Sequence, residues 1–374
     1  MRVWPGCFCA IAALLLTGQG HAACPSPAAD QTVAVPGHPF AAEATSDNCH
    51  LFASLSQGPA SGAVAVLTNE KGSFGVTRSV RLPRGSGAGL ALSHDGSMLA
   101  VSTGEALVLL DAEKLVTADE DPLIATVPEG SHGAVYTQFS KDDALLFVSE
   151  EDSASIAVLN VAALRQGQGS KAVVGRIATG QAPVGLALSP DGSRLFSTSQ
   201  IAGISAECMP EQGGGRPHAK GALLSIDVAK AATDLRHAVV GMAKLGCNPV
   251  RVAVTADGHS LWVSERGDGR VLGIDPSSLA SGGARVTRIE VGKSPVGLAI
   301  RPDGQQLWIA DSDRFANGGG ALALVTPAIA GEAKLASTIR VGAFPRDLRF
   351  LPDGKTLVAA LYGEDAVLLH PTEP

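Results

Sequence analysis

The sequence has 374 residues, of which 45% are hydrophobic and 17% are charged, and it contains 44 glycines and 22 prolines. This composition is typical of a turn-rich all-β protein and excludes a helical or disordered chain. The formal net charge of −7 provides no basic surface for nucleic acid or an anionic membrane, so we predict no nucleic-acid partner.

Residues 1–23 are typical of a secretory signal peptide. Arg2 supplies the positive charge, Phe8 to Leu16 form a short apolar core, and Gly20-His21-Ala22 provides a cleavage site of small residues. Removal of this segment takes the net charge to 29 − 1 − 36 = −8. We therefore expect a periplasmic or secreted protein.

The rest of the chain allows further expectations about anchoring and domain organisation. Lipid anchoring at Cys24 is a minor alternative, because His21 stands where a lipoprotein signal has an aliphatic residue. No later stretch contains the about 18 uninterrupted apolar residues of a transmembrane helix. We expect residues 24–374 to form a single domain and the protein to be a monomer.

A strand, a tight turn at an aspartate and a second strand recur along the chain. The turn aspartates are Asp47, Asp95, Asp142, Asp191, Asp257, Asp303 and Asp353, with spacings of 48, 47, 49, 66, 46 and 50 residues. Such a period fits one four-stranded propeller blade per unit. We expect each aspartate to accept hydrogen bonds from its own turn, and Asn48 and Asp143 to replace the turn glycine in two units.

Each unit is predicted to contain four strands, named A to D. In unit five these are Pro249 to Thr255, Leu261 to Ser264, Arg270 to Ile274 and Arg285 to Val291. Trp262 and Trp308 occupy matching positions in B strands, so we expect both to pack between blades.

The ends of the chain are predicted to close the ring. Unit seven ends soon after its C strand, Ala366 to Leu369, and has no D strand of its own. Residues 31–35 resemble a D strand, so we expect them to complete blade seven and remove an exposed sheet edge. The predicted fold is therefore an all-β, seven-bladed β-propeller with four-stranded blades, closed by the N-terminal strand.

Alternating strand directions sort the connections onto two faces. The A–B turns and C–D loops share one face, called the turn face, while the D–A and B–C loops share the other, called the loop face. Four of the six cysteines follow the signal peptide. Cys24 and Cys49 fall on the turn face and Cys208 and Cys247 on the loop face, so we predict the disulfides Cys24–Cys49 and Cys208–Cys247.

The repeats resemble a known family. Pro183 to Gly192 and Pro295 to Gly304 both read Pro-Val-Gly-Leu-Ala-(Leu/Ile)-x-Pro-Asp-Gly, and Gly-x-x-Pro junctions begin at Gly180, Gly246, Gly292 and Gly342. These features are similar to those of YVTN-repeat propellers, exported or surface proteins related to the seven-bladed lactonase-like family. The Tyr-Val-Thr-Asn tetrapeptide itself is absent. No lactonase catalytic set maps onto the chain, so the resemblance implies the fold and not the activity.

The loop face is the predicted binding surface, because it carries the long loops around the central channel. Residues 201–220 form an insertion in blade four that accounts for its longer spacing. A loop of this length is typical of a binding element, although its glycines are equally compatible with a flexible connection that has no binding role.

Polar residues on this face are the candidate ligand-binding groups, with polarity from exposure to water as the alternative explanation. They are His38, His132, Glu150, Arg251, Glu265, Lys293, Asp311, Arg346 and His218. Arg251 and Arg346 follow junction prolines, so we expect them in equivalent positions, where they could form an anion clamp. Asp311 and Asp313 could bind calcium, whose ligands are oxygens, but two carboxylates are weak evidence, so no cofactor or metal is predicted.

We therefore expect an exported YVTN-type propeller that binds an unidentified protein or small molecule through the loop face. The absence of a catalytic motif favours a binding protein over an enzyme. The alternative is a lactonase-like hydrolase with a polar site at the mouth of the central channel.

Overall fold

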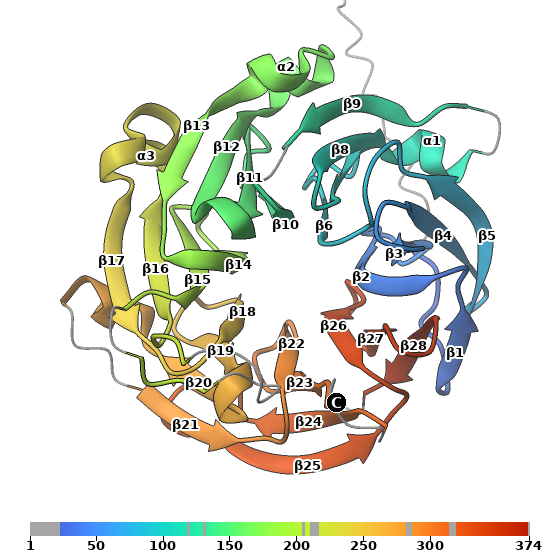
Figure 1. The fold of residues 1–374 in the computed structure, drawn as a ribbon. Coiled ribbons are helices and arrows are strands. Elements are labelled where there is room, and N and C mark those ends of the chain that lie inside the picture. The colour runs from blue at the N-terminus through green and yellow to red at the C-terminus, as the bar shows by residue number, and fades with distance from the viewer. Residues whose placement is uncertain are drawn as a thin grey trace, which may run out of the picture.

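The computed structural model describes residues 23–372 apart from 118–119, 130–131, 204–205, 210–216, 282–285 and 314–318. Seven four-stranded antiparallel sheets surround a central axis as the blades of a propeller (Figure 1). The predicted fold class is confirmed. Residues 1–22 of the predicted signal peptide lie outside the described residues.

In each blade the inner strand lies beside the axis and the outer strand at the rim (Figure 1). Blades 1 to 4 consist of β2 (His38–Ala44), β3 (His50–Ser56), β4 (Gly62–Glu70) and β5 (Ser73–Arg81); β6 (Leu90–Leu92), β7 (Met98–Ser102), β8 (Ala106–Asp111) and β9 (Leu123–Pro128); β10 (Ala134–Phe139), β11 (Leu145–Glu150), β12 (Ser155–Asn160) and β13 (Val173–Ala178); and β14 (Gln181–Leu188), β15 (Arg194–Ile201), β16 (Ala222–Asp227) and β17 (Val239–Lys244).

The remaining three blades follow in chain order, and the last uses a strand from the N-terminal region. Blades 5 to 7 consist of β18 (Pro249–Val254), β19 (Leu261–Glu265), β20 (Arg270–Ile274) and β21 (Val286–Glu290); β22 (Pro295–Ile300), β23 (Leu307–Asp311), β24 (Ala321–Thr326) and β25 (Lys334–Arg340); and β26 (Pro345–Phe350), β27 (Thr356–Leu361), β28 (Ala366–Pro371) and β1 (Gln31–Ala34).

The ring closes as the sequence predicts. Strand β1 is antiparallel to β28, with Gln31 opposite Leu369 and Ala34 opposite Ala366. It supplies the outer strand of blade 7, so the N-terminal strand and the last strand of the chain lie side by side (Figure 1). This pairing gives the backbone N–H and C=O groups at the edge of β28 hydrogen-bond partners, and it joins both ends of the domain.

Short helices, which the strand pattern did not predict, follow the C strands of blades 2, 3 and 4 at the rim of the ring (Figure 1). They are α1 (Ala112–Val116), α2 (Val161–Arg165) and α3 (Val228–Thr233), and their N-terminal amides are capped by the side chains of Asp111, Asn160 and Asp227. The 3₁₀ turns are η1 (Glu151–Ser153), η2 (Gly169–Ala172), η3 (Leu235–His237), η4 (Arg266–Asp268) and η5 (Pro276–Ser281).

All seven turn aspartates hold their own turns, as predicted. Their Oδ1 atoms accept hydrogen bonds of 2.9 to 3.1 Å from the backbone N–H groups of Cys49, Ser97, Ala144, Ser193, His259, Gln305 and Lys355. Asn48 and Asp143 adopt φ values of 60° and 54° in place of the turn glycine. The turn face is therefore built from repeated, locally satisfied carboxylates.

The core lies between neighbouring blades, where the two tryptophans pack as predicted. Trp262 is fully buried against Ile309 of the next blade, and its indole N–H donates to the Ala328 carbonyl at 3.0 Å. Trp308 packs against Leu348 and Leu357 of blade 7. These contacts join blades 5, 6 and 7.

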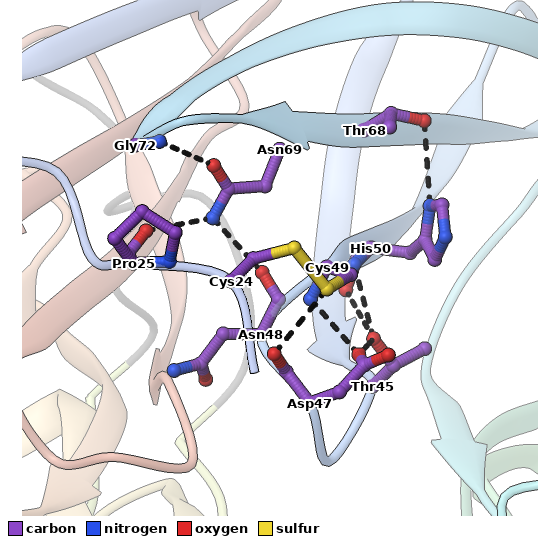
Figure 2. The surroundings of a disulfide bond; sticks show 10 residues. All are labelled: Cys24, Pro25, Thr45, Asp47, Asn48, Cys49, His50, Thr68, Asn69 and Gly72. Carbon is purple, nitrogen blue, oxygen red and sulfur yellow. Dashed lines mark hydrogen bonds between the residues drawn. A yellow bond between two sulfur atoms is a disulfide. The ribbon is translucent and has the colours of Figure 1, made fainter. Parts of the chain in front are cut away.

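Both predicted disulfides are present. Cys24–Cys49 ties the segment before β1 to the first aspartate turn, where Cys24 N–H also donates to the Asp47 carbonyl at 2.8 Å (Figure 2). The Asn69 side chain donates to the carbonyls of Pro25 and Asn48 and so supports the same segment (Figure 2). Cys208–Cys247 joins the blade 4 insertion to the next D–A loop on the loop face.

Two disulfides indicate an oxidising compartment. Across the part of the chain that the structure describes, none of the helices has the length and apolar character needed to cross a membrane.

A cavity at the centre of the loop face

The inner strands present two successive rings of side chains around the axis. The first ring contains the residue that follows the junction proline or its equivalent, and its members are Phe40, Ala88, Val135, Val184, Val250, Val296 and Arg346 in blades 1 to 7. Six of these side chains are apolar, and blade 7 alone contributes a charge. Arg346 is thus the one member that departs chemically from the repeat.

Hydroxyl groups on B strands fix the first ring. Ser149, Thr198 and Ser264 each donate to the first-ring carbonyl of the following blade, at 3.0, 2.7 and 2.8 Å, and Ser54 donates to Ala88 in the same way. Because these hydrogen bonds are buried and link adjacent blades, they fix the position of the first-ring backbone relative to the preceding blade. The sequence contains a signal for these hydrogen bonds, because the hydroxyl residue recurs at one position of the B strand.

The second ring alternates small and large residues. It consists of Ala41, Gly89, Tyr136, Gly185, Arg251, Gly297 and Asp347. A Cβ at Gly89 would lie 2.5 Å from the Tyr136 ring, and one at Gly297 would lie 3.0 Å from Asp347 Cα. Glycine is therefore required where the large side chains of neighbouring blades approach the axis.

This alignment corrects one prediction. Arg346 follows Pro345 directly, whereas Arg251 is the second residue after Pro249. Arg251 and Arg346 are therefore not equivalent: Arg346 belongs to the first ring, and Arg251 matches Asp347 in the second. The physical consequence is that Arg251 and Asp347 can face each other across the axis.

A cavity of about 320 Å³ opens at this point on the loop face, and we call it the axial cavity. Its lining residues are Phe40, Val135, Tyr136, Glu151, Val184, Gln200, Val250, Arg251, Arg266, Val296, Phe344 and Arg346. Blades 1 and 3 to 7 all contribute, so the cavity exists only in the closed ring. Six of its twelve lining residues are valine or phenylalanine, and its charged groups are three arginines and one glutamate.

Arg251 is a buried arginine with an internal partner. Its Nη2 lies 3.1 Å from Asp347 Oδ1, and both side chains are almost fully buried. Its guanidinium carbon also lies 3.6 Å from the centroid of the Tyr136 ring. Burial lowers the pKa of Arg251 to about 9, with Asp347 opposing the shift and Arg346 adding to it. The group nonetheless remains cationic at neutral pH.

Arg346 is surrounded by aromatic rings instead of carboxylates. Its guanidinium carbon lies 3.8 Å from the centroid of Phe40, 5.1 Å from Tyr362 and 5.4 Å from Phe344. Among the described residues it has neither an ion pair nor a hydrogen bond from its side chain. Burial lowers the pKa of Arg346 to about 10. Its N–H donors are therefore available on the wall of the axial cavity.

The D–A loop of blade 7 adds a strained residue. This loop position has a positive φ in four blades, where it is occupied by Ala182, Asn248, Ser294 and Phe344. Phe344, with φ of 52°, is the bulky member of the set, and a bulky side chain is unfavourable in this left-handed region. The strain places an aromatic ring at the cavity, a pattern typical of functional sites.

Polar side chains from blades 3, 4 and 5 form the opposite wall. Gln200 donates to Glu151 Oε1 at 2.9 Å and accepts from Arg266 at 3.0 Å. Tyr136 also lines the cavity, and its hydroxyl is buried without a hydrogen-bond partner among the described residues. Sequence reasoning missed Phe40, Tyr136 and Gln200, because aromatic and amide residues on inner strands resemble core positions.

The structure brings only part of the predicted site together. Arg251 and Arg346 line the axial cavity. His38 lies beside it, stacked on Tyr362 at 5.0 Å between ring centroids, and pairs with Asp365 at 2.5 Å. Arg346 and His38 both lie next to the Tyr362 ring, whereas Arg251 lies over the Tyr136 ring.

The predicted acids instead support their own loops. Glu265 is buried, pairs with Arg270 at 2.6 Å and accepts from the Gly246 N–H. Asp311 accepts from the Lys293 N–H at 2.9 Å, while the Lys293 side chain is exposed. Burial raises the pKa of Glu265, and it raises the pKa of Asp311 to about 6.

The two remaining histidines also lie outside the cavity lining. His132 is half-buried in the D–A loop before blade 3, where its backbone N–H donates to the Glu129 carbonyl. His218 forms an antiparallel bridge with Cys208, and its Nδ1 lies 2.9 Å from the Ala219 carbonyl. Residues 204–205 and 210–216 of the insertion lie outside the described residues.

Glu150 belongs to a buried acid pair that shares one arginine. Arg176 Nη2 lies 2.8 Å from Glu150 and 3.3 Å from Glu129, and both carboxyl groups are fully buried. Burial, followed by the neighbouring Glu150, raises the pKa of Glu129 to about 8. Burial opposes ionisation of Glu150, but hydrogen bonds from Arg176 and Ser155 outweigh it and lower its pKa. The pair therefore holds one proton at neutral pH.

No cluster of three or more His, Cys, Asp or Glu side chains suited to a metal ion occurs among the described residues. At the calcium alternative, Asp313 is the neighbouring carboxylate that acts on Asp311. The expectation that no cofactor is needed stays a prediction.

Comparison with known proteins establishes the fold. No family model matches the sequence, and no curated protein matches it either. A chain of Kuenenia stuttgartiensis hydrazine synthase is similar in structure, with a TM-score of 0.68 and 19% identity over 90% of this chain and 96% of that chain. The Myceliophteria thermophila Cps50 (Swd1) β-propeller domain has a TM-score of 0.66 and 13% identity over 92% of this chain and 100% of that domain. These identities support a shared fold alone.

Proposed function

We propose that this protein is an exported, YVTN-type β-propeller that binds a small molecule in the axial cavity, with the insertion at residues 201–220 flanking the site. The observation that carries the proposal is Arg346, a cation on the cavity wall without a carboxylate partner among the described residues. Arg346 is half-buried, and a cation that is partly removed from water without a counterion costs stability, so its presence in an otherwise apolar ring favours a role in binding. The cavity volume of about 320 Å³ suits a small molecule better than a protein segment.

The insertion is attached close to this site. Cys247, the disulfide partner of Cys208 in the insertion, lies four residues before Arg251, and the described part of the insertion borders a second cavity of about 390 Å³ at Met242. Because the disulfide fixes the insertion to the D–A loop that leads to Arg251, the two features form one continuous part of the loop face. This arrangement supports a binding role for the insertion.

Binding is favoured over the lactonase-like alternative by the chemistry of the cavity wall. Among the twelve lining residues, Glu151 is the one carboxylate, and it already accepts a hydrogen bond from Gln200. Hydrolysis of a lactone requires a group that activates water, and a single carboxylate tied to an amide is a poor candidate.

A small-molecule screen by thermal unfolding tests the proposal. Val184→Trp fills the cavity, and Val174→Trp, on the exposed outer strand β13, is the matched control. We expect ligands that raise the melting temperature of the wild type and of Val174→Trp but not of Val184→Trp. Equal shifts in all three proteins would place binding elsewhere, and lactone turnover that Val184→Trp abolishes would favour the hydrolase.

A further inference from the structure

We infer that the ligand of the axial cavity is an organic monocarboxylate with an apolar body, whose carboxylate is bound by Arg346. This inference rests on the proposed function and adds the chemical class of the ligand. It is carried by three features of the cavity: its uncompensated charge, the aromatic packing of Arg346 and the apolar first ring.

The charge balance of the cavity calls for one negative charge. Arg251 on its wall is balanced by Asp347, whereas the side chain of Arg346 has no ion pair among the described residues. Arg346 therefore leaves one positive charge of the wall unbalanced. A monoanion balances this charge, whereas a dianion such as phosphate would leave an excess beside Glu151 and Asp347.

The packing of Arg346 leaves it suited to a planar anion. Phe40 covers the guanidinium at 3.8 Å from its centroid, and Phe344 and Tyr362 lie further out. Stacking on an aromatic ring occupies a face of the guanidinium and leaves the in-plane N–H fork to form bonds. A carboxylate accepts two parallel hydrogen bonds from such a fork.

The first-ring part of the cavity wall suits an apolar ligand body. Val135, Val184, Val250 and Val296 line it from four consecutive blades. The buried Tyr136 hydroxyl, which has no partner among the described residues, adds a polar group that a ligand oxygen could satisfy. An aromatic or branched monocarboxylate would therefore place its charged end at Arg346 and its body against the valines.

Isothermal titration of phenylacetate into the purified protein tests the inference, with phenylacetamide as the uncharged isostere. Arg346→Val introduces the residue of blades 3 to 6, Arg346→Lys keeps the charge without the fork, and Arg165→Val removes a half-exposed arginine of the turn face as the control. We expect phenylacetate to bind the wild type and Arg165→Val equally. Arg346→Val should weaken it at least about tenfold, Arg346→Lys should weaken it less, and phenylacetamide should bind about tenfold more weakly.

Several outcomes would overturn the inference. These are failure of phenylacetate to bind at millimolar concentration, binding that Arg346→Val leaves unchanged, equal affinity for the amide, and displacement of phenylacetate by equimolar inorganic phosphate. If acid and amide both bind, independently of Arg346, and Val184→Trp abolishes both, the cavity is a binding site of another specificity and the proposed function stands. If Val184→Trp changes neither, the proposed function fails as well.

Discussion

The two faces of the propeller use charged residues in opposite ways. On the turn face, seven aspartates repeat from blade to blade, and each accepts a hydrogen bond from its own turn. On the loop face, Arg346 interrupts a ring of apolar side chains and has no carboxylate partner among the described residues. The difference teaches that residues which keep the repeat stabilise the blades, whereas a residue which breaks it is available for binding.

The largest change in the free energy of unfolding is expected for Arg251, in contrast to Arg346. Arg251→Met should lower the free energy of unfolding by about 3–5 kcal/mol, because it leaves the Asp347 carboxylate buried without a partner. Urea unfolding measures this change. The double variant Arg251→Met/Asp347→Leu should recover most of the loss, since it removes both charges. A neutral effect of Arg251→Met alone would show that Arg251 does not stabilise the fold.

On the turn face, the largest effect is expected at the disulfide that joins the segment before β1 to the first aspartate turn. Cys24→Ser/Cys49→Ser should lower the free energy of unfolding by about 3 kcal/mol, because the disulfide closes a loop between residues 25 positions apart. Chemical unfolding of the variant measures the loss. Ligand binding at the axial cavity should be unaffected below the melting temperature, and a loss of binding in the folded variant would contradict the separation of the faces.

Glu129 gives the loop face a pH dependence between about pH 4.5 and 8. Its folded pKa of about 8 lies above the usual value of 4.5, so the folded state retains a proton that the unfolded state loses. The associated stability is complete below about pH 4.5 and is lost as the pH rises toward 8.

Glu129→Gln imitates the protonated acid and should remove this dependence. We expect the variant to be more stable than the wild type by about 1–2 kcal/mol at pH 8 and similar to it at pH 5. Melting temperatures across this range provide the measurement, and Glu105→Gln, an exposed residue of the adjoining turn, is the control. Parallel profiles for wild type and Glu129→Gln would show that Glu129 is ionised in the folded protein.

A single turn aspartate should have the smallest effect. Hydrogen bonds from Ser189 and Ser193 lower the pKa of Asp191 to about 2, so its contribution is present above its usual pKa of 3.8 and is lost as the pH falls toward 2. Asp191→Asn should cost only about 0.5–1 kcal/mol at pH 7, because the group is exposed to solvent. The difference from wild type should disappear near pH 2; a difference that persists there would exclude the charge as its cause.

The sequence predicts the parts of this molecule that repeat. The aspartate period gives seven blades, and the missing D strand of unit seven gives the closure by residues 31–35. The alternation of strand direction places two cysteines on the turn face and two on the loop face, and the two disulfides pair the cysteines of each face. These inferences succeed because each depends on a pattern with several copies or on the direction of the chain.

The cavity could not be derived in the same way. Arg251 and Asp347 are 96 residues apart and meet only across the closed ring. An error of one residue in aligning blades 5 and 7 made Arg251 and Arg346 equivalent, although one is an internal ion-pair partner and the other is not. Contacts across the axis depend on aligning the blades to the exact residue. Each such contact occurs once, so the sequence offers no repeated pattern against which to check the alignment.

The most direct test of the role of Arg346 compares the wild type with Arg346→Val by thermal unfolding, with and without phenylacetate. Valine is the residue at this position in blades 3 to 6, so the unliganded variant should be at least as stable as the wild type. Phenylacetate should raise the melting temperature of the wild type and leave that of Arg346→Val unchanged. A clearly destabilised variant, or equal stabilisation of both proteins by phenylacetate, would contradict the claim that Arg346 serves a ligand and not the fold.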